Sequence, residues 1–172
     1  KIAVIASALE GTVSGSSVAN TVGSGSFTIP MMKRLGYKPE FAGAVEAAAS
    51  TGGQIMPPIM GAAAFIMAEF LNMPYLDIAK AAAIPACLYF FGVFMEVHFE
   101  AKRSKLRGVS RDELPRFALV MKERGHLLVP LVAIIVFLGW GYTPLYAALV
   151  GLGICVLAAQ LKKSTRMDVM DV

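Results

Sequence analysis

The first 35 residues consist of two apolar arms separated by a short tract of serine and glycine at residues 14–17. Each arm contains about 13–18 residues, which is roughly 20–27 Å of helix. The hydrocarbon core of a bilayer is about 30 Å thick, so neither arm crosses it comfortably. Because dense serine and glycine favour a turn, the pattern predicts a re-entrant helical hairpin over residues 1–35, with residues 14–17 at its tip.

A second apolar segment, residues 36–72, is interrupted by helix-hostile residues in its middle. Its interruption reads STGGQIMPP and covers residues 50–58. Pro57 and Pro58 lack an N–H, so the carbonyls of Gly53 and Gln54 lose their helical partners. An unpaired carbonyl is costly in lipid unless the gap lines a cavity or touches protein. We therefore predict a broken transmembrane helix whose gap is lined by oxygen atoms.

The remaining pattern completes an all-α membrane protein. Residues 73–98 predict a transmembrane helix, and residues 126–161 predict a helical hairpin around the GYT turn. Residues 99–125 form a basic cytoplasmic loop in which helical spacing of apolar residues predicts a short amphipathic helix on the membrane interface. A plain cytoplasmic linker fits that loop equally well. Residues 162–172 are expected to be a cytoplasmic tail.

Composition supports the membrane assignment. Hydrophobic residues make up 56% of the 172 residues, charged residues make up 16%, and the mean hydropathy is +0.63. Soluble domains have more charge and less apolar content. The net charge is +4, and eight of the sixteen Lys and Arg residues fall between residues 102 and 124. This clustering is typical of a cytoplasmic loop, and without a nucleic-acid motif it argues against a nucleic-acid partner.

Two features point to chemistry inside the membrane. Carbonyl and hydroxyl oxygens at residues 50–58 suit a small hard cation such as Na⁺, and free N–H groups at the start of the resumed helix suit a carboxylate. The polar hairpin tip has the same character. The alternative is that the interruptions are ordinary kinks, repaired by neighbouring helices, water or hydroxyl side chains.

Glu46 lies one helical turn before Ser50 in a strongly apolar segment. An intramembrane carboxylate is a functional hypothesis by default. It could carry a coupling proton or balance a cation held at the break. The alternative is a structural role, in which Glu46 pairs with Lys or Asn on a neighbouring element or reaches the cytoplasmic interface.

The segments SGSSVAN, GSFTIPMMKRLGY and PEFAGAVEAAASTGGQIMPPIMGAAAFIMAEF resemble the large membrane subunit of tripartite ATP-independent periplasmic (TRAP) transporters. More narrowly they resemble the fused-permease form, which commonly works with a TAXI-type periplasmic binding protein. The resemblance implies part of an elevator-type secondary transporter in a bacterial or archaeal inner membrane. It implies cation-coupled import, usually with Na⁺, of small organic acids of the dicarboxylate or 2-oxo acid type.

Carried over position by position, the resemblance implies two sets of site residues. The cation set is Ser14, Gly15, Ser16, Ser17, Asn20, Ser50, Thr51, Gly52 and Gly53. The substrate set is Ser17, Asn20, Gln54, Pro57 and Pro58.

Beyond the coupling Na⁺ or proton no cofactor is expected, and the partners are the binding protein, the lipid bilayer and the remaining parts of a longer permease. The chain is expected to be a fragment of that permease. It carries neither a nucleophile paired with a base nor a phosphate loop, so an enzyme is not expected. The main alternative function is a non-transporting membrane scaffold that uses its Gly and Ser residues for close helix packing.

Overall fold

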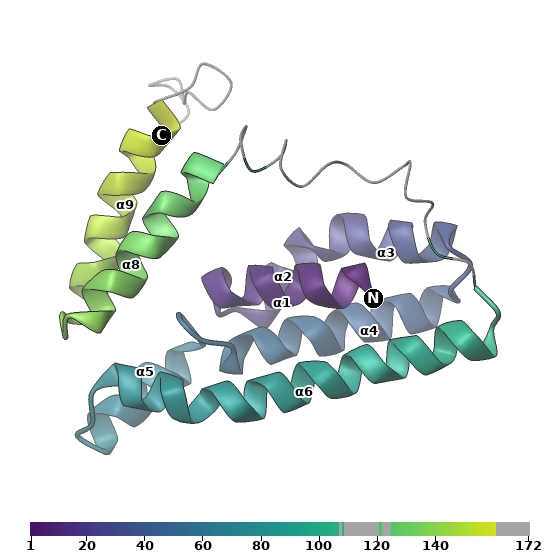
Figure 1. Cartoon of the computed structure of the whole chain (residues 1–172), viewed down its shortest axis with the longest axis horizontal. Coiled ribbons are helices and arrows are strands. Elements are labelled where there is room, and N and C mark those ends of the chain that lie inside the picture. The colour runs from purple at the N-terminus through teal and green to yellow at the C-terminus, as the bar shows by residue number, and fades with distance from the viewer. Residues whose placement is uncertain (107, 109–120, 122–124, 161–172) are drawn as a thin grey trace. The chain divides into compact units, whose positions relative to one another are not determined.

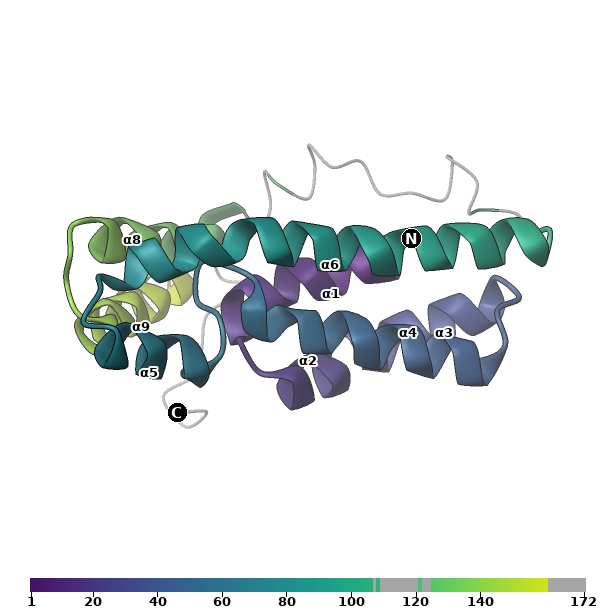
Figure 2. The ribbon, with the colours of Figure 1, turned by 90° about the horizontal axis from the view of Figure 1, so that it is seen from below.

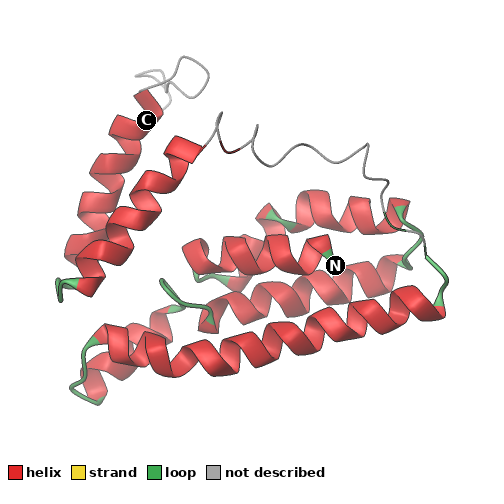
Figure 3. Cartoon of the chain, in the orientation of Figure 1, coloured by secondary structure: helices red, strands yellow, loops and turns green. Residues whose placement is uncertain are grey.

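The computed structural model describes residues 1–106, 108, 121 and 125–160, and these residues form helices and loops without a strand (Figure 3). The prediction of an all-α protein is confirmed. The chain divides into two compact units, Lys1–Val109 and Ser110–Val172. Both predicted site segments belong to the first unit.

The first unit begins with a helical hairpin (Figure 1). Helix α1 (Ile2–Ser14) ends at Gly15, whose φ of 58° is left-handed and therefore suits glycine. Ser16 caps α2 (Ser17–Gly23) by accepting a hydrogen bond from the Ala19 amide. Ser24 is itself helical and leads directly into α3 (Gly25–Arg34), so α2 and α3 form one returning arm.

The next helix is interrupted within the predicted segment. Helix α4 (Pro39–Gly52) starts with proline and has an acidic residue in its first turn, both favourable there. It passes into a short 3₁₀ turn, η1 (Gly53–Ile55), and Met56 is extended, as a residue before proline prefers. The helix resumes as α5 (Ala62–Phe70), four residues after Pro58.

Helix α6 (Tyr75–Arg103) has 29 residues and runs the length of the unit (Figure 2). It extends five residues past the predicted end at residue 98, and Lys102 and Arg103 in its last turn interact favourably with the helix dipole. Within the described part of the chain it is the one helix long and apolar enough to cross a membrane; α1, α8 and α9 are apolar but shorter.

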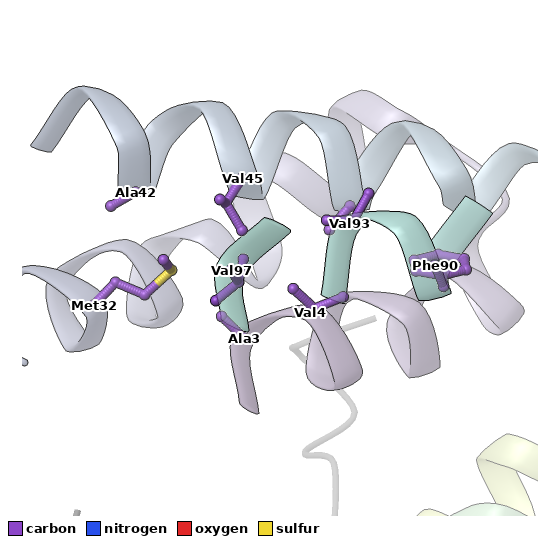
Figure 4. Close-up of a cluster of buried hydrophobic side chains, with 9 residues drawn as sticks. Ala3, Val4, Met32, Ala42, Val45, Phe90, Val93 and Val97 are labelled. Atoms are coloured by element: carbon purple, nitrogen blue, oxygen red, sulfur yellow. The ribbon is translucent and has the colours of Figure 1, made fainter. Parts of the chain in front are cut away.

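The core of the first unit lies where α1, α3, α4 and α6 meet (Figure 4). Both α4 and α6 contribute side chains at spacings of three and four residues, which is one face of a helix. The buried apolar residues are Ala3, Val4, Met32, Ala42, Val45, Ala49, Phe90, Val93 and Val97. This core holds the hairpin against the first half of the broken helix, while α5 packs on α6.

The second unit is a helical hairpin described on its own. A 3₁₀ turn, η3 (Gly125–Leu128), leads into α8 (Val129–Gly139), and α9 (Pro144–Gln160) packs against α8. Gly151 lies directly on the Ile134 side chain, so the two helices approach closely there. The predicted amphipathic helix of the basic loop, apart from Met121, and the predicted tail lie outside the described residues.

Candidate site where a hairpin tip meets a helix break

The hairpin tip lies against the loop that interrupts the second predicted helix. A Cβ atom on Gly15 would be 1.8 Å from the Met60 carbonyl oxygen, and one on Gly61 would be 3.3 Å from the Gly15 oxygen. Gly15 and Met60 both have left-handed backbones, with φ of 58° and 59°. The fold therefore brings together the two interruptions that the sequence singled out.

A glycine pair lets the two segments approach backbone to backbone. A Cβ on Gly53 would lie 2.8 Å from both the Gly11 Cα and the Asn20 Nδ2, which is closer than real contacts allow. Gly11 was not among the site residues predicted from the sequence. The spacing does indicate it, because Ser7, Gly11 and Gly15 recur every four residues and so form a stripe of small residues along one face of α1 and its C-cap.

Side-chain hydrogen bonds hold the hairpin at this junction, and one of them crosses to the loop of the helix break. The Ser14 hydroxyl donates to Asn20 Oδ1 at 2.5 Å, and Asn20 Nδ2 donates to the Ser7 carbonyl at 3.5 Å. The Gln54 amide donates to the Ser17 hydroxyl at 2.9 Å. Asn20 is fully buried whereas Gln54 is exposed, so the junction has a buried polar side and an open polar edge.

The expectation that the proline pair leaves unpaired carbonyls is wrong. The Gly53 oxygen accepts from the Met56 amide at 3.3 Å, and the Gln54 oxygen accepts from the Gly61 amide at 2.7 Å. The chain achieves this by tightening into the 3₁₀ turn and folding the loop back on itself. The carbonyls of Pro58 and Ile59 are in turn contacted by the Tyr75 hydroxyl at the start of α6.

Three other predicted positions, Ser16, Thr51 and Gly52, make their contacts away from the junction between tip and break. The exposed Thr51 hydroxyl donates to the Ala47 carbonyl of its own helix. Gly52 faces α6, where a Cβ would be 2.6 Å from the Tyr89 ring. Ser16 uses its side chain as the N-cap of α2. These residues stand beside the junction, and Pro57 and Pro58 are half-buried in its loop.

Glu46 is 1% exposed and is surrounded by hydroxyl groups. Its Oε1 accepts from Ser24 at 2.5 Å and from Ser50 at 3.1 Å, and its Oε2 accepts from Thr28 at 2.5 Å. The Ser7 and Ser50 hydroxyls lie 3.3 Å apart. The carboxylate thus meets hydroxyls of the returning arm and of its own helix rather than a Lys or Asn partner, and Ser7 of α1 reaches the cluster through Ser50. The carboxylate does not reach an interface.

The tip and the buried carboxylate belong to one polar chain. Asn20 contacts Ser14 through its side chain, and its backbone carbonyl accepts from the Ser24 hydroxyl at 2.8 Å. Ser24 then contacts Glu46. No group of three or more His, Cys, Asp or Glu side chains gathers among the residues in the described ranges. An ion held along this chain would have mainly hydroxyl, amide and carbonyl oxygens as ligands, which suits Na⁺ and not a transition metal.

The family model of the DctM component of tripartite ATP-independent periplasmic transporters matches residues 1–172. An uncharacterized protein of Salmonella typhimurium (strain LT2), YgiK, is 27% identical over 135 residues, which is 73% of this chain and 31% of that relative. The chain thus spans about a third of the length of this curated relative. No solved structure matches the chain.

Proposed function

Since the chain belongs to the family of the DctM component of tripartite ATP-independent periplasmic transporters, we propose that it forms part of the permease of a cation-coupled secondary transporter. It lies in the inner membrane of a bacterium or archaeon and imports small organic acids. A periplasmic binding protein, of the TAXI type found with fused permeases, delivers the solute. The remaining parts of a longer permease complete the transport pathway, in keeping with the 31% of YgiK that the chain covers.

The observation that carries this proposal is the meeting of the hairpin tip and the helix break. A binding site inside a membrane needs polar groups that converge from separate elements while their backbones stay paired. Here the two segments approach through their backbones, at Gly15 with Met60 and at Gly11 with Gly53. A polar side-chain contact, Gln54 with Ser17, joins them beside these approaches. Broken helices that meet in this way are the design by which secondary transporters bind solute and ion together.

The open edge of the junction is the proposed substrate site. Gln54 offers amide protons and Ser17 a hydroxyl, and at present each uses the other as its partner. A carboxylate can replace this neutral contact with stronger, charge-assisted hydrogen bonds. Pro57 and Pro58 are half-buried in the loop beside this edge, and Asn20 is buried behind it. A dicarboxylate or 2-oxo acid is the proposed class of solute.

The coupling cation, Na⁺ by preference, is proposed to bind at the buried side of the junction. Ser14, Gly15, Asn20 and Gly53 bring hydroxyl, amide and carbonyl oxygens there from both segments. A cation at the buried side of the junction also offsets the negative charge of a solute bound at the open edge, which links the two binding events.

Uptake by the full-length permease tests the proposal. The permease and its binding protein would be reconstituted in liposomes, with 2-oxoglutarate and succinate as probes and with Na⁺ and proton gradients imposed separately. We expect gradient-dependent uptake, and we expect Gln54→Leu to lower it at least about tenfold, because a hydrogen bond to a charged group is lost. Ser26→Ala, on the exposed face of α3, is the matched control. Normal gradient-driven uptake by Gln54→Leu would refute the site, and no uptake under either gradient would favour the scaffold alternative.

A further inference from the structure

The Glu46 cluster is a second polar centre, separate from the junction between tip and break. It consists of the Glu46 carboxylate and the hydroxyls of Ser7, Ser24, Thr28 and Ser50. Its members come from α1, from the α2–α3 arm and from α4. Ser7, Ser24 and Thr28 were not anticipated from the sequence, because nothing local distinguishes them from other small polar residues in apolar helices.

Charge is the unusual feature of this centre. A buried carboxylate is stable only when its negative charge is paired, coordinated or neutralised. Glu46 is 1% exposed, and three hydroxyl groups are its hydrogen-bond partners in the described part of the chain. Hydroxyls carry no net charge, so they solvate the carboxylate without neutralising it.

Charged and titratable groups on the packed elements lie elsewhere. Glu10 of α1 lies against Gly23, and the Tyr89 hydroxyl of α6 donates to the Ala48 carbonyl. Lys33 and Arg34 are exposed in the last turn of α3, beyond the hydroxyl cluster. None of these contacts supplies a positive charge to Glu46.

The contacts of the Ser24 hydroxyl fit a Glu46 carboxyl group that carries a cation. Ser24 Oγ lies 2.8 Å from the Asn20 carbonyl oxygen and 2.5 Å from Glu46 Oε1, yet a hydroxyl has a single proton to donate. Both contacts are hydrogen bonds at once when Glu46 carries a proton and donates it to Ser24. A bound Na⁺ can take the place of this proton: it takes the carboxylate and hydroxyl oxygens as ligands, with these two oxygens further apart than in the protonated pair, and leaves the hydroxyl proton for Asn20.

From these observations we propose that the Glu46 cluster is an exchangeable site for one monovalent cation, Na⁺ or a proton. The cation neutralises the carboxylate and so stabilises the packing of the α2–α3 arm on α4. Its loss leaves a bare charge between the two elements and favours their separation. This inference rests on the proposed transport function, because it adds a second cation site that is linked through Ser24 and Asn20 to the cation site proposed at the junction.

Infrared spectroscopy of the intact permease in lipid nanodiscs tests the inference without any transported solute. Difference spectra between wild type and Glu46→Gln isolate the bands of Glu46, in sodium-free buffer and then in sodium, from mildly acidic to mildly alkaline pH. Glu40→Gln, on an exposed position of the same helix, is the control for an unrelated carboxyl group.

Two results support the site. A protonated-acid band in sodium-free buffer that is lost as pH rises identifies a proton site. A carboxylate band that shifts on addition of Na⁺, with loss of the acid band, identifies a sodium site. In either case Thr28→Val should weaken cation binding about tenfold, because it deletes a hydrogen bond to the carboxyl group, and Glu46→Asp should retain a weakened response.

Two results overturn the inference. One is an acid band that neither pH nor Na⁺ changes, which would make Glu46 a permanently neutral structural acid. The other is an ionised carboxylate band in sodium-free buffer that neither condition alters. Because these bands are recorded without uptake, a failed uptake assay would overturn the transport proposal while leaving the cation site to be judged on its spectra.

Discussion

At the scale of single residues, the fold depends on positions where a side chain is absent. Gly11 and Gly53 touch through their backbones, and Gly15 faces the Met60 carbonyl with no space between. Hydroxyl groups have the complementary role, since Ser7, Ser24 and Ser50 are small enough to be buried beside Glu46. The polar junction therefore exists because small residues line both segments.

Substitution of Gly53 tests this close approach. In the full-length permease we expect Gly53→Ala to lower the free energy of unfolding by about 1–3 kcal/mol, the usual cost of overpacking a well-packed interior. The added methyl would lie 2.8 Å from the Gly11 Cα and from Asn20 Nδ2. Uptake by the same variant should fall, because the junction is pushed apart.

Gly43→Ala is the control for that substitution. Gly43 lies in α4, the helix that leads into the turn containing Gly53, and a Cβ there meets nothing within 4 Å. Alanine is the better helix former, so we expect Gly43→Ala to leave the midpoint of thermal unfolding unchanged or slightly raised. Equal unfolding midpoints for the two variants would show that the glycine contact contributes nothing.

At the scale of elements, the interruption between α4 and α5 is an ordered turn in which backbone groups find partners. The loop bonds to itself through Gln54 and Gly61, and Tyr75 fixes it to α6 by way of the Pro58 and Ile59 carbonyls. The Tyr75 ring stacks on Phe65 at 4.6 Å between centroids, which ties α5 to the same point. Tyr75 is therefore a positioning residue for the loop that faces the hairpin tip.

Tyr75→Phe tests that role because it keeps the ring and removes the hydroxyl. Two half-buried carbonyls then lose their donor, and we expect a local cost of about 1–3 kcal/mol. Hydrogen exchange measured by mass spectrometry should show faster exchange at the Gly61 amide, which Gln54 otherwise protects. Tyr142→Phe, on an exposed turn of the second unit, is the control. Unchanged exchange at Gly61 would mean that the loop holds its shape without Tyr75.

At the scale of the molecule, the first unit has one markedly basic end. The exit of the hairpin with Lys33 and Arg34, the start of α4 with Lys38 and the end of α6 with Lys102 and Arg103 all lie there. The loop between α5 and α6 lies at the opposite end of α6 (Figures 1 and 2). The positive-inside rule then places the basic end in the cytoplasm.

Labelling with a membrane-impermeant thiol reagent tests this orientation in the full-length permease. With Cys87 and Cys155 replaced by serine, Lys33→Cys and Lys102→Cys should be labelled only after the cells are permeabilised. Met73→Cys, exposed in the loop before α6, should be labelled in intact cells. Labelling of Lys33→Cys in intact cells would contradict both the orientation and the predicted re-entrant path of the hairpin.

The sequence by itself determined the features that arise within a few residues of the chain. Proline lacks an N–H, serine caps a helix and apolar runs have a countable length, so the helical class, the turn at the tip and the interruption after residue 52 were all predictable. Only the tertiary structure decided what those features meet. Three sets of contacts join segments that lie 16 to 42 residues apart in the chain. They are the hydrogen bonds of Glu46 to Ser24 and Thr28, the contact of Gly11 with Gly53, and the contacts of the Tyr75 hydroxyl with the loop carbonyls. Such contacts depend on which helix faces pack together. That packing is decided by the whole unit, so a pattern within a few residues of the chain does not predict it.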